Sequence, residues 1–254
     1  MDFNLKGKVA IVTGGGSGLG AAISEVLAEE GTNVIVNYIV DEANVFKFVD
    51  GLNEKYPQAK AIPLYGDITK AKDIEDVMAR AVDIYGKVDI LVNNAGIWPT
   101  CFVKDMTDEE WERTVRINLT GTFMFSKRMV DHLLGRNGKG KIINIVSQAA
   151  FHGSTSGHAH YAAAKGGVVT FTVSLAREVA KYGINVTAVA PGMMRTPMNK
   201  RELAEREDKY IERIPLGRIS DPKEVAYTVA FLASEKADYI TGATIDVTGG
   251  MLMR

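Results

Sequence analysis

The sequence is poor in cysteine, with Cys101 as the single thiol among 254 residues. One thiol cannot form a disulfide within the chain, and no second cysteine stands at the spacing of a metal-ligand pair. These absences exclude a small secreted fold stabilised by disulfides, and they lead us to expect no metal site. A reducing, cytoplasmic location is the expectation that fits best.

Long apolar runs and an excess of charge of one sign are also lacking. No segment approaches the roughly 20 apolar residues of a membrane-spanning helix, and residues 1–8 carry charges where a signal peptide has an apolar core. The 30 basic and 31 acidic side chains leave a net charge of -1. A chain so nearly balanced has no overall attraction for polyanions, so we expect it to bind neither nucleic acid nor a membrane.

Short apolar segments alternate with amphipathic helical segments along the chain. Residues 9–12 and 142–146 are almost continuously apolar, as strands of a parallel sheet are when helices cover both faces. We predict about seven strands, at residues 9–13, 33–38, 61–65, 88–93, 141–147, 185–190 and 244–247. Helices are predicted at residues 19–30, 41–55, 70–85, 108–134, 159–182 and 221–234, some of them capped by residues such as Thr69 and Asp221.

This alternation predicts a Rossmann-type, doubly wound parallel sheet with helices on both faces. No repeat or long linker divides the sequence, so we expect a single domain over residues 1–254. Residues 192–216 depart from the pattern, because they are charged, contain methionines and are interrupted by Pro197 and Pro215. They predict a mobile insertion over the substrate that carries a short helix.

A glycine-rich loop follows the first strand and leads directly into a helix. It reads TGGGSGLG over residues 13–20. Gly14 allows a tight turn, Gly18 lets the main chain approach a pyrophosphate, and Gly20 permits close packing of the helix, whose N-terminus attracts anions. A plain flexible turn is the alternative, but the flanking strand and helix favour phosphate binding, with Ser17 and Leu19 among the contacts.

The spacing of these glycines resembles that of the classical short-chain dehydrogenase/reductase family. Further matches follow in order along almost the whole chain, at residues 93–96, Asn118, Ser147, residues 161–165 and residues 191–192. The resemblance implies an oxidoreductase that transfers a hydride between a nicotinamide cofactor, NAD or NADP, and a secondary alcohol or ketone. A nicotinamide-binding sensor without turnover is the alternative from another class, and the complete set of catalytic residues argues against it.

The expected catalytic residues are Asn118, Ser147, Tyr161 and Lys165. Tyr161 and Lys165 stand four residues apart on a predicted helix, so they share a face. The Lys165 cation, together with the charge of the oxidised nicotinamide, is expected to lower the pKa of the phenol from ~10. Ser147 ends a predicted parallel strand at the edge where such sheets bind ligands, and it is expected to hold the substrate oxygen. The resemblance implies that Asn118 bends its helix and holds a water that leads protons to the lysine.

The resemblance also implies the remaining cofactor contacts. Asp67 and Ile68 are expected near the adenine, and Tyr161 and Lys165 near the nicotinamide ribose. Other contacts are expected along the fourth strand end and over the nicotinamide, at Asn94, Ala95, Gly96, Pro191, Gly192, Met194 and Thr196. Without the resemblance, each of these residues could simply belong to a turn or loop with no role in binding.

The choice between NAD and NADP depends on the end of the second strand. Asn37 and Tyr38 stand where an NAD enzyme usually has an acid. Ser17 and Ile39 stand where enzymes that prefer the phosphorylated cofactor often carry a cation. We favour NAD, with Asn37 bonding a ribose hydroxyl.

The substrate itself is not identified by the sequence. We expect a small alcohol or ketone beside Ser147, and 3-oxoacyl thioesters, sugars, and steroid or aryl alcohols stay open. His152, His158 and His160 are expected to line or rim the pocket rather than to bind a metal. The predicted substrate wall consists of Gln148, Trp98, Phe151, His158 and Met193, with Met194 and Met198 as further apolar candidates. A homotetramer is expected through residues 108–134 and 159–182.

Overall fold

Seven parallel strands form one sheet at the centre of the computed structural model, which describes residues 3–154 and 156–254. Their order is β3-β2-β1-β4-β5-β6-β7, and every neighbouring pair is parallel. The predicted fold class is therefore confirmed, and predicted strand ends differ by at most two residues. The strands are β1 (Val9–Thr13), β2 (Asn33–Tyr38), β3 (Ala61–Tyr65), β4 (Ile90–Asn93), β5 (Gly140–Ile145), β6 (Ile184–Pro191) and β7 (Thr244–Val247).

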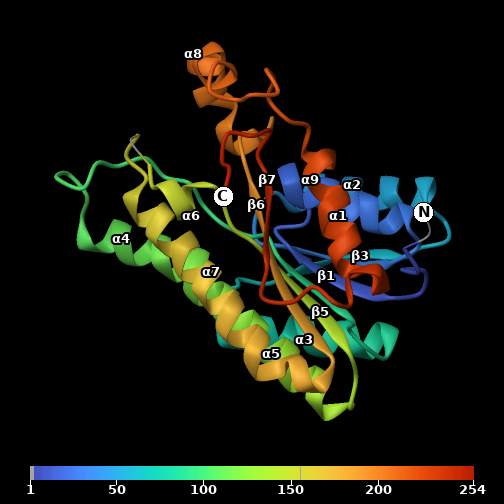
Figure 1. Ribbon diagram of the computed structural model, residues 1–254. Helices are drawn as coiled ribbons and strands as arrows, with labels where there is room; N and C mark the ends of the chain where they lie inside the picture. The colour runs from blue at the N-terminus through green and yellow to red at the C-terminus, as the bar shows by residue number, and fades with distance from the viewer. Residues whose placement is uncertain (1–2, 155) are drawn as a thin grey trace.

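Helices cover both faces of this sheet (Figure 1). One face carries α1 (Gly18–Glu29), α2 (Glu42–Lys55) and α9 (Pro222–Ala233). The other carries α3 (Ala71–Tyr85), α4 (Asp108–Val115), α5 (Gly121–Gly135) and α7 (Ala159–Val179). The core explains the continuous apolar strands, because Ala10 and Val12 of β1 pack under the first set while Val9 and Ile11 pack under the second.

The predicted helix over residues 108–134 is divided by a wider turn. A π-helix, η1 (Arg116–Thr120), joins α4 to α5. At the start of α9, Asp221 accepts a hydrogen bond from the amide of Lys223 and forms a capping box with Glu224, as expected. Thr69 does not cap α3, because its amide and hydroxyl both donate to Asp67 instead.

The insertion carries a short helix, as predicted. It contains η3 (Pro197–Asn199) and α8 (Lys200–Ile211), with a kink at Arg206, and Figure 1 shows α8 standing out beyond the end of the sheet. Two short 3-10 helices and one short α-helix were not predicted. They are η2 (Ala180–Tyr182), η4 (Glu235–Ala237) and α6 (Ala149–His152).

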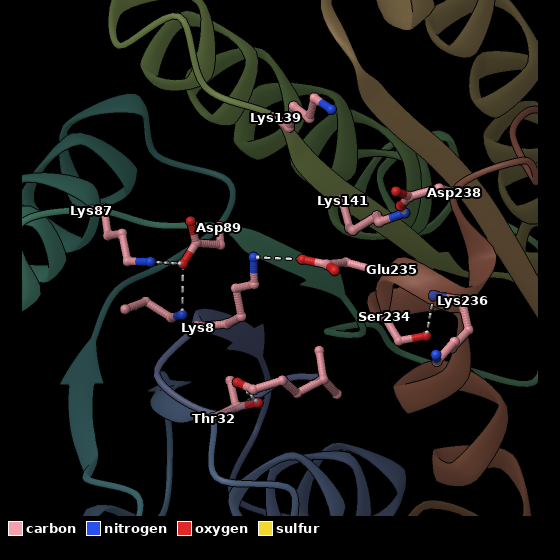
Figure 2. Close-up of polar contacts among 12 residues, drawn as sticks. Lys8, Thr32, Lys87, Asp89, Lys139, Lys141, Ser234, Glu235, Lys236 and Asp238 are labelled. Atoms are coloured by element: carbon pink, nitrogen blue, oxygen red, sulfur yellow. Dashed lines mark hydrogen bonds and ion pairs between the residues drawn. The ribbon is translucent and has the colours of Figure 1, made fainter. Parts of the chain in front are cut away.

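Charged pairs fix the edge of the sheet opposite the predicted site (Figure 2). The carboxylate of Asp89 accepts from the amide of Val9 at 3.0 Å and pairs with Lys87 at 2.9 Å. Lys141, which is buried, pairs with Asp238 at 2.6 Å. Among the described helices, none has the length and apolar character needed to cross a membrane.

The chain reverses its direction across the sheet between β1 and β4. It builds β1, β2 and β3 in one direction and then crosses back to place β4 on the other side of β1. Connections that leave neighbouring strands in opposite directions open a crevice at the carboxyl edge of the sheet. The glycine loop follows β1 and residues 94–96 follow β4, so both predicted cofactor segments border this crevice.

Candidate active site

The glycine loop has the shape of an anion cradle. Gly14 and Gly18 have positive φ angles of 60° and 51°, which residues with side chains rarely adopt. A Cβ on Gly20 would lie 2.0 Å from the carbonyl oxygen of Gly14, so only glycine lets α1 approach the loop. Ser17, the N-cap of α1, forms no side-chain cap, which leaves the first-turn N–H groups of α1 free to bind phosphate oxygens.

Thr13 at the end of β1 and Asn94 directly after β4 connect the two strand ends that border the crevice. The hydroxyl of Thr13 accepts from the amides of Asn94 and Ala95 at 2.9 and 3.0 Å. The Asn94 amide group donates to the carbonyls of Thr13 and Gly14 at 2.9 and 3.2 Å. The predicted cofactor residue Asn94 therefore shapes the loop that would hold the phosphates.

Tyr161 and Ser147 border the same cavity at the carboxyl edge of the sheet. Ser147 follows β5, and its oxygen also accepts from the amide of Ala149 at 3.2 Å, so it helps to begin α6. Tyr161 lies in the first turns of α7. The two predicted catalytic hydroxyls are thus brought together by elements that the sequence placed separately.

Lys165 lies one turn further along α7 and beneath Tyr161. Its ammonium donates to the carbonyl of Ile145 at 2.7 Å and lies 5.8 Å from the centre of the Tyr161 ring. The side chain is buried, and this burial lowers the pKa of Lys165 to about 8. The spacing of four residues has the predicted result, because both side chains share one face of α7.

The groups of the protein itself raise the pKa of Tyr161, whereas Lys165 was expected to help lower it. Burial raises the pKa of Tyr161 to about 12, and a hydrogen bond with Ser147 offsets only part of that rise. Lys165 alone does not lower the pKa of Tyr161, because burial dominates and the ammonium is directed at the Ile145 carbonyl. The part of the prediction that depends on the charge of the oxidised nicotinamide stays a prediction.

Asn118 lies at the centre of η1 and is fully buried. Its amide group donates to the carbonyls of Ile97 and Thr114 at 3.0 and 3.1 Å, and its oxygen accepts from the amide of Ile97 at 3.2 Å. The side chain thus competes with regular helical bonding, which explains the π-helix and the predicted bend. A Cβ on Gly96 would lie 2.5 Å from the Asn118 oxygen, so this contact also requires glycine.

The segment after β6 closes over the glycine loop. The amide of Gly192 donates to Val247 at 2.9 Å, and the amide and hydroxyl of Thr196 donate to the Asn199 oxygen. A Cβ on Gly18 would lie 3.4 Å from the Cβ of Thr196, so this segment reaches the phosphate cradle. Of the residues predicted here, Gly192, Met194 and Thr196 also border the cavity, whereas Pro191 is buried in β6.

The predicted adenosine contacts have structural partners of their own. The Asn37 amide group donates to the carbonyls of Leu64 and Gly66 at 3.3 and 3.0 Å. The Tyr38 hydroxyl donates to Glu42 at 2.7 Å, and its ring packs edge-on against Phe46 and Tyr65. Asn37 therefore offers only its oxygen to a ribose.

Asp67 and Ile68 also have places in the protein itself. The Asp67 carboxylate accepts from the amide and hydroxyl of Thr69 at 2.9 and 2.7 Å. Ile68 is buried in the core, and a Cβ on Gly121 would lie 2.8 Å from its Cδ1. The turn before α3 is therefore held by the residues expected near the adenine.

The substrate cavity has a volume of about 190 Å³ beside Ser147 and Tyr161. Five predicted substrate residues line it, namely Trp98, Ser147, Gln148, His158 and Met193. Phe151 does not, because its ring lies 3.6 Å from the Arg254 guanidinium and packs against an apolar cluster. The prediction for Phe151 was wrong, since α6 turns the side chain away from the cavity.

Several lining residues were not assigned to the substrate from the sequence. The insertion was expected over the substrate, but its sequence pattern does not indicate which of its side chains face the cavity. The orientation of these side chains depends on the kinked α8 and on the last residues of the chain. The main lining residues that the sequence did not predict are Asn199, Tyr210, Arg213 and Met251.

The three histidines before Tyr161 have different environments. His158 stacks on Trp98 with ring centres 4.3 Å apart, and its Nδ1 lies 2.7 Å from the Pro99 carbonyl. His152 lines the cavity, as expected of a rim residue. His160 is fully buried with neither ring nitrogen bonded to a described residue, and it does not line the cavity. Within residues 3–154 and 156–254, no cluster of potential metal ligands is present.

A second hollow, of about 430 Å³, lies on α4 and η1 and is lined by residues such as Trp111, Glu112 and Arg116. None of the predicted catalytic residues borders it. Ser147 and Tyr161 border the smaller cavity instead.

Comparison with known proteins gives matches over nearly the full length. A family model described as Enoyl-(Acyl carrier protein) reductase matches residues 14–252. The 3-oxoacyl-(acyl-carrier-protein) reductase FabG of Vibrio cholerae is 43% identical over 99% of this chain and 100% of that protein. The 3beta-hydroxysteroid dehydrogenase 1 of Eggerthella lenta is 40% identical over 98% of this chain and 95% of that protein.

Solved structures are similar as well. A putative gluconate dehydrogenase from Agrobacterium tumefaciens has a TM-score of 0.92 and 35% identity, and the match covers 100% of this chain and 99% of that one. The chain belongs to the classical short-chain dehydrogenase/reductase family, whose members are nicotinamide-dependent, and it is an oxidoreductase that interconverts ketones and alcohols.

Proposed function

We propose that the cavity beside Ser147 and Tyr161 is the site of this reaction, with Tyr161 transferring the proton to or from the substrate oxygen. The observation that carries the proposal is the meeting of these two hydroxyls in one cavity beside the glycine cradle. Ser147 orients the oxygen, and Tyr161 acts as the general acid or base. The nicotinamide, when bound, supplies or accepts the hydride.

Without the charge of a bound cofactor, the raised pKa of Tyr161 suits the phenol to the role of an acid. A phenol whose pKa is raised to about 12 keeps its proton at pH 7 and can donate it to a carbonyl oxygen. Oxidation of an alcohol requires the phenolate, which is the minor form in that range. Reduction of a ketone is therefore the direction for which the protein's own groups are prepared.

Lys165 and Asn118 support this chemistry from behind the cavity. The Lys165 cation is held on the Ile145 carbonyl, below the nicotinamide ribose that it is proposed to bind. The side chain of Asn118 is already bonded to main-chain groups of Ile97 and Thr114. A water on the path to Lys165 therefore has to be held by main-chain groups of η1 rather than by the Asn118 side chain.

The cofactor that fits better is NAD. The residues around the expected 2′ position, Ser17, Asn37 and Ile39, carry no positive charge. The free oxygen of Asn37 can accept a bond from a ribose hydroxyl but cannot donate one to a phosphate. A 2′-phosphate would thus lack the cation that usually compensates it.

Reduction of 3-oxoacyl thioesters is the first candidate for the physiological reaction. The relative from Vibrio cholerae, named for that reaction, is similar over the whole chain. Oxidation of a sugar acid is the second, supported by the likeness to the putative gluconate dehydrogenase. Turnover of acetoacetyl-coenzyme A, sugar acids and simple ketones with each cofactor tests the proposal, and tight cofactor binding without any turnover would favour a sensor.

We propose a homotetramer in which α4, α5 and α7 contribute one self-complementary interface. These helices lie side by side on one flank of the molecule (Figure 1). Trp111 and Phe123 are exposed there, at 43% and 47%. Ala163 is also exposed. Gly167 instead packs against Leu119 of the same chain, because a Cβ on Gly167 would lie 2.8 Å from the Leu119 side chain. A monomer mass by light scattering at micromolar concentration would contradict this assembly.

A further inference from the structure

Arg213 places a permanent positive charge at the border of the substrate cavity. Among the described lining residues there is no other arginine or lysine, and no aspartate or glutamate. Arg213 follows α8 and lies at the end of the insertion. The cavity therefore has one place where a substrate anion could be compensated.

Arg213 differs from the other arginines around the insertion. Its guanidinium has no hydrogen bond or ion pair with any residue that the structure describes, whereas four neighbouring arginines are paired. The pairs are Arg195–Glu207 at 2.6 Å, Arg201–Glu205 at 3.3 Å, Arg206–Glu202 at 3.2 Å and Arg218–Glu224 at 2.6 Å.

One acid of the same insertion, which shares Tyr210 as a neighbour with Arg213, already has partners. Glu202 of α8 accepts from Arg206 and from the Tyr210 hydroxyl, at 3.2 and 3.0 Å. Tyr210 lines the cavity together with Arg213. Burial and the hydrogen bond with Glu202 raise the pKa of Tyr210 to about 12, and the charges of Arg206 and Arg213 offset part of that rise. The pairing of Glu202 thus leaves the guanidinium available at the cavity wall.

The other polar groups of the cavity are suited to neutral parts of a substrate. Gln148 is buried, its amide group lies 3.0 Å from the Met251 sulfur, and its oxygen has no partner among the described residues. If Nδ1 of His158 donates to the Pro99 carbonyl, Nε2 is left as an acceptor. An anion would be repelled by these acceptors and attracted to Arg213.

We propose that the substrate carries an anionic end group that binds Arg213 while its carbonyl lies between Ser147 and Tyr161. The inference rests on the proposed function and adds to it the class of substrate, an acid-bearing oxo compound. In the reaction the carbonyl π bond opens, a hydride supplied by the reduced nicotinamide forms the new C–H bond, and the Tyr161 proton forms the O–H bond. Tyr161 is left as a phenolate and takes a proton back from solvent. The anionic group is the carboxylate of a short oxo acid or the phosphate of a carrier-linked thioester, since a guanidinium binds both.

Steady-state kinetics with three probes test this inference. Acetoacetate carries a carboxylate, methyl acetoacetate is its neutral counterpart, and acetoacetyl-coenzyme A carries phosphates. We expect R213Q to lower kcat/KM for an anionic probe about tenfold, mainly through KM, which corresponds to about 1.4 kcal/mol. A loss for acetoacetate identifies the carboxylate as the source, and a loss for the coenzyme A thioester identifies the phosphate.

A matched variant and a neutral substrate separate the possible outcomes. R201Q removes the same charge from the same insertion outside the cavity, and it should keep the wild-type ratio of anionic to neutral turnover. R213K should retain part of the preference. Two results would overturn the inference: the same ratio of anionic to neutral turnover in R213Q and wild type, or a wild-type preference for the ester over both anionic probes. In either case turnover of the ester would still support the proposed function. No turnover of any of the three probes would overturn the inference, and the wider test with sugar acids and simple ketones would then decide the proposed function.

Discussion

The buried ammonium of Lys165 should give the protein a measurable dependence of stability on pH. Burial lowers its pKa from 10.5 to about 8 in the folded protein. At 1.36 kcal/mol for each unit, the charged form costs the folded state about 3 kcal/mol at pH 7 relative to the unfolded chain. Between pH 8 and 10.5 the unfolded chain binds more protons, so the free energy of unfolding should rise with pH in that interval.

Replacing Lys165 with Met isolates this contribution. K165M loses the bond to the Ile145 carbonyl but also the buried charge, so at pH 7 we expect it to be more stable than wild type by about 1–3 kcal/mol. Urea unfolding at pH 7, 8, 9 and 10 should show that lead shrinking as the pH rises. K47M, at an exposed site on α2, controls for the lost charge. A constant difference between K165M and wild type across these pH values would refute the reasoning.

The remaining predictions concern the cradle, the phenol and the cofactor. G20A should weaken cofactor binding and lower the free energy of unfolding by about 1–3 kcal/mol, because its Cβ would meet the Gly14 carbonyl at 2.0 Å. G51A, on α2 with open space around it, should instead stabilise the protein by about 0.5–1 kcal/mol, and denaturant titration compares the two. Alcohol oxidation should accelerate between pH 7 and 10, because the pKa of Tyr161 is raised to about 12, and a rate plateau already below pH 8 would contradict control by burial. Steady-state kinetics with both cofactors should favour NAD, and a kcat/KM more than about tenfold higher with NADP would overturn the proposed role of Asn37.

The sequence predicts the sheet and the loop well, because their signals are local. Apolar strands and helix periodicity follow from burial on two faces, and the glycine spacing follows from backbone clashes such as that at Gly20. The spacing of Tyr161 and Lys165 likewise needs only a regular helix. Each of these features depends on residues close together in the chain.

Features that depend on distant contacts could not be predicted in this way. Phe151 turns away from the cavity to meet Arg254, and the amide group of Asn37 donates to the carbonyls of Leu64 in β3 and of Gly66 after it. The pKa of Tyr161 depends on burial, which the spacing of two residues does not reveal. Arg213 lies in a segment rich in charged residues, so its sequence position does not distinguish it from the other arginines. The structure does, because the neighbouring arginines form ion pairs and Arg213 forms none with a described residue.

The central claim, that Tyr161 carries the reacting proton, is tested most directly by Y161F. The substitution removes one hydroxyl and keeps the ring, so cofactor affinity measured by titration should stay close to that of wild type. The rate of ketone reduction should fall by ~10²- to 10⁴-fold, the usual contribution of a general acid. An enzyme that binds cofactor normally and retains more than about a tenth of its activity would contradict the assignment of Tyr161.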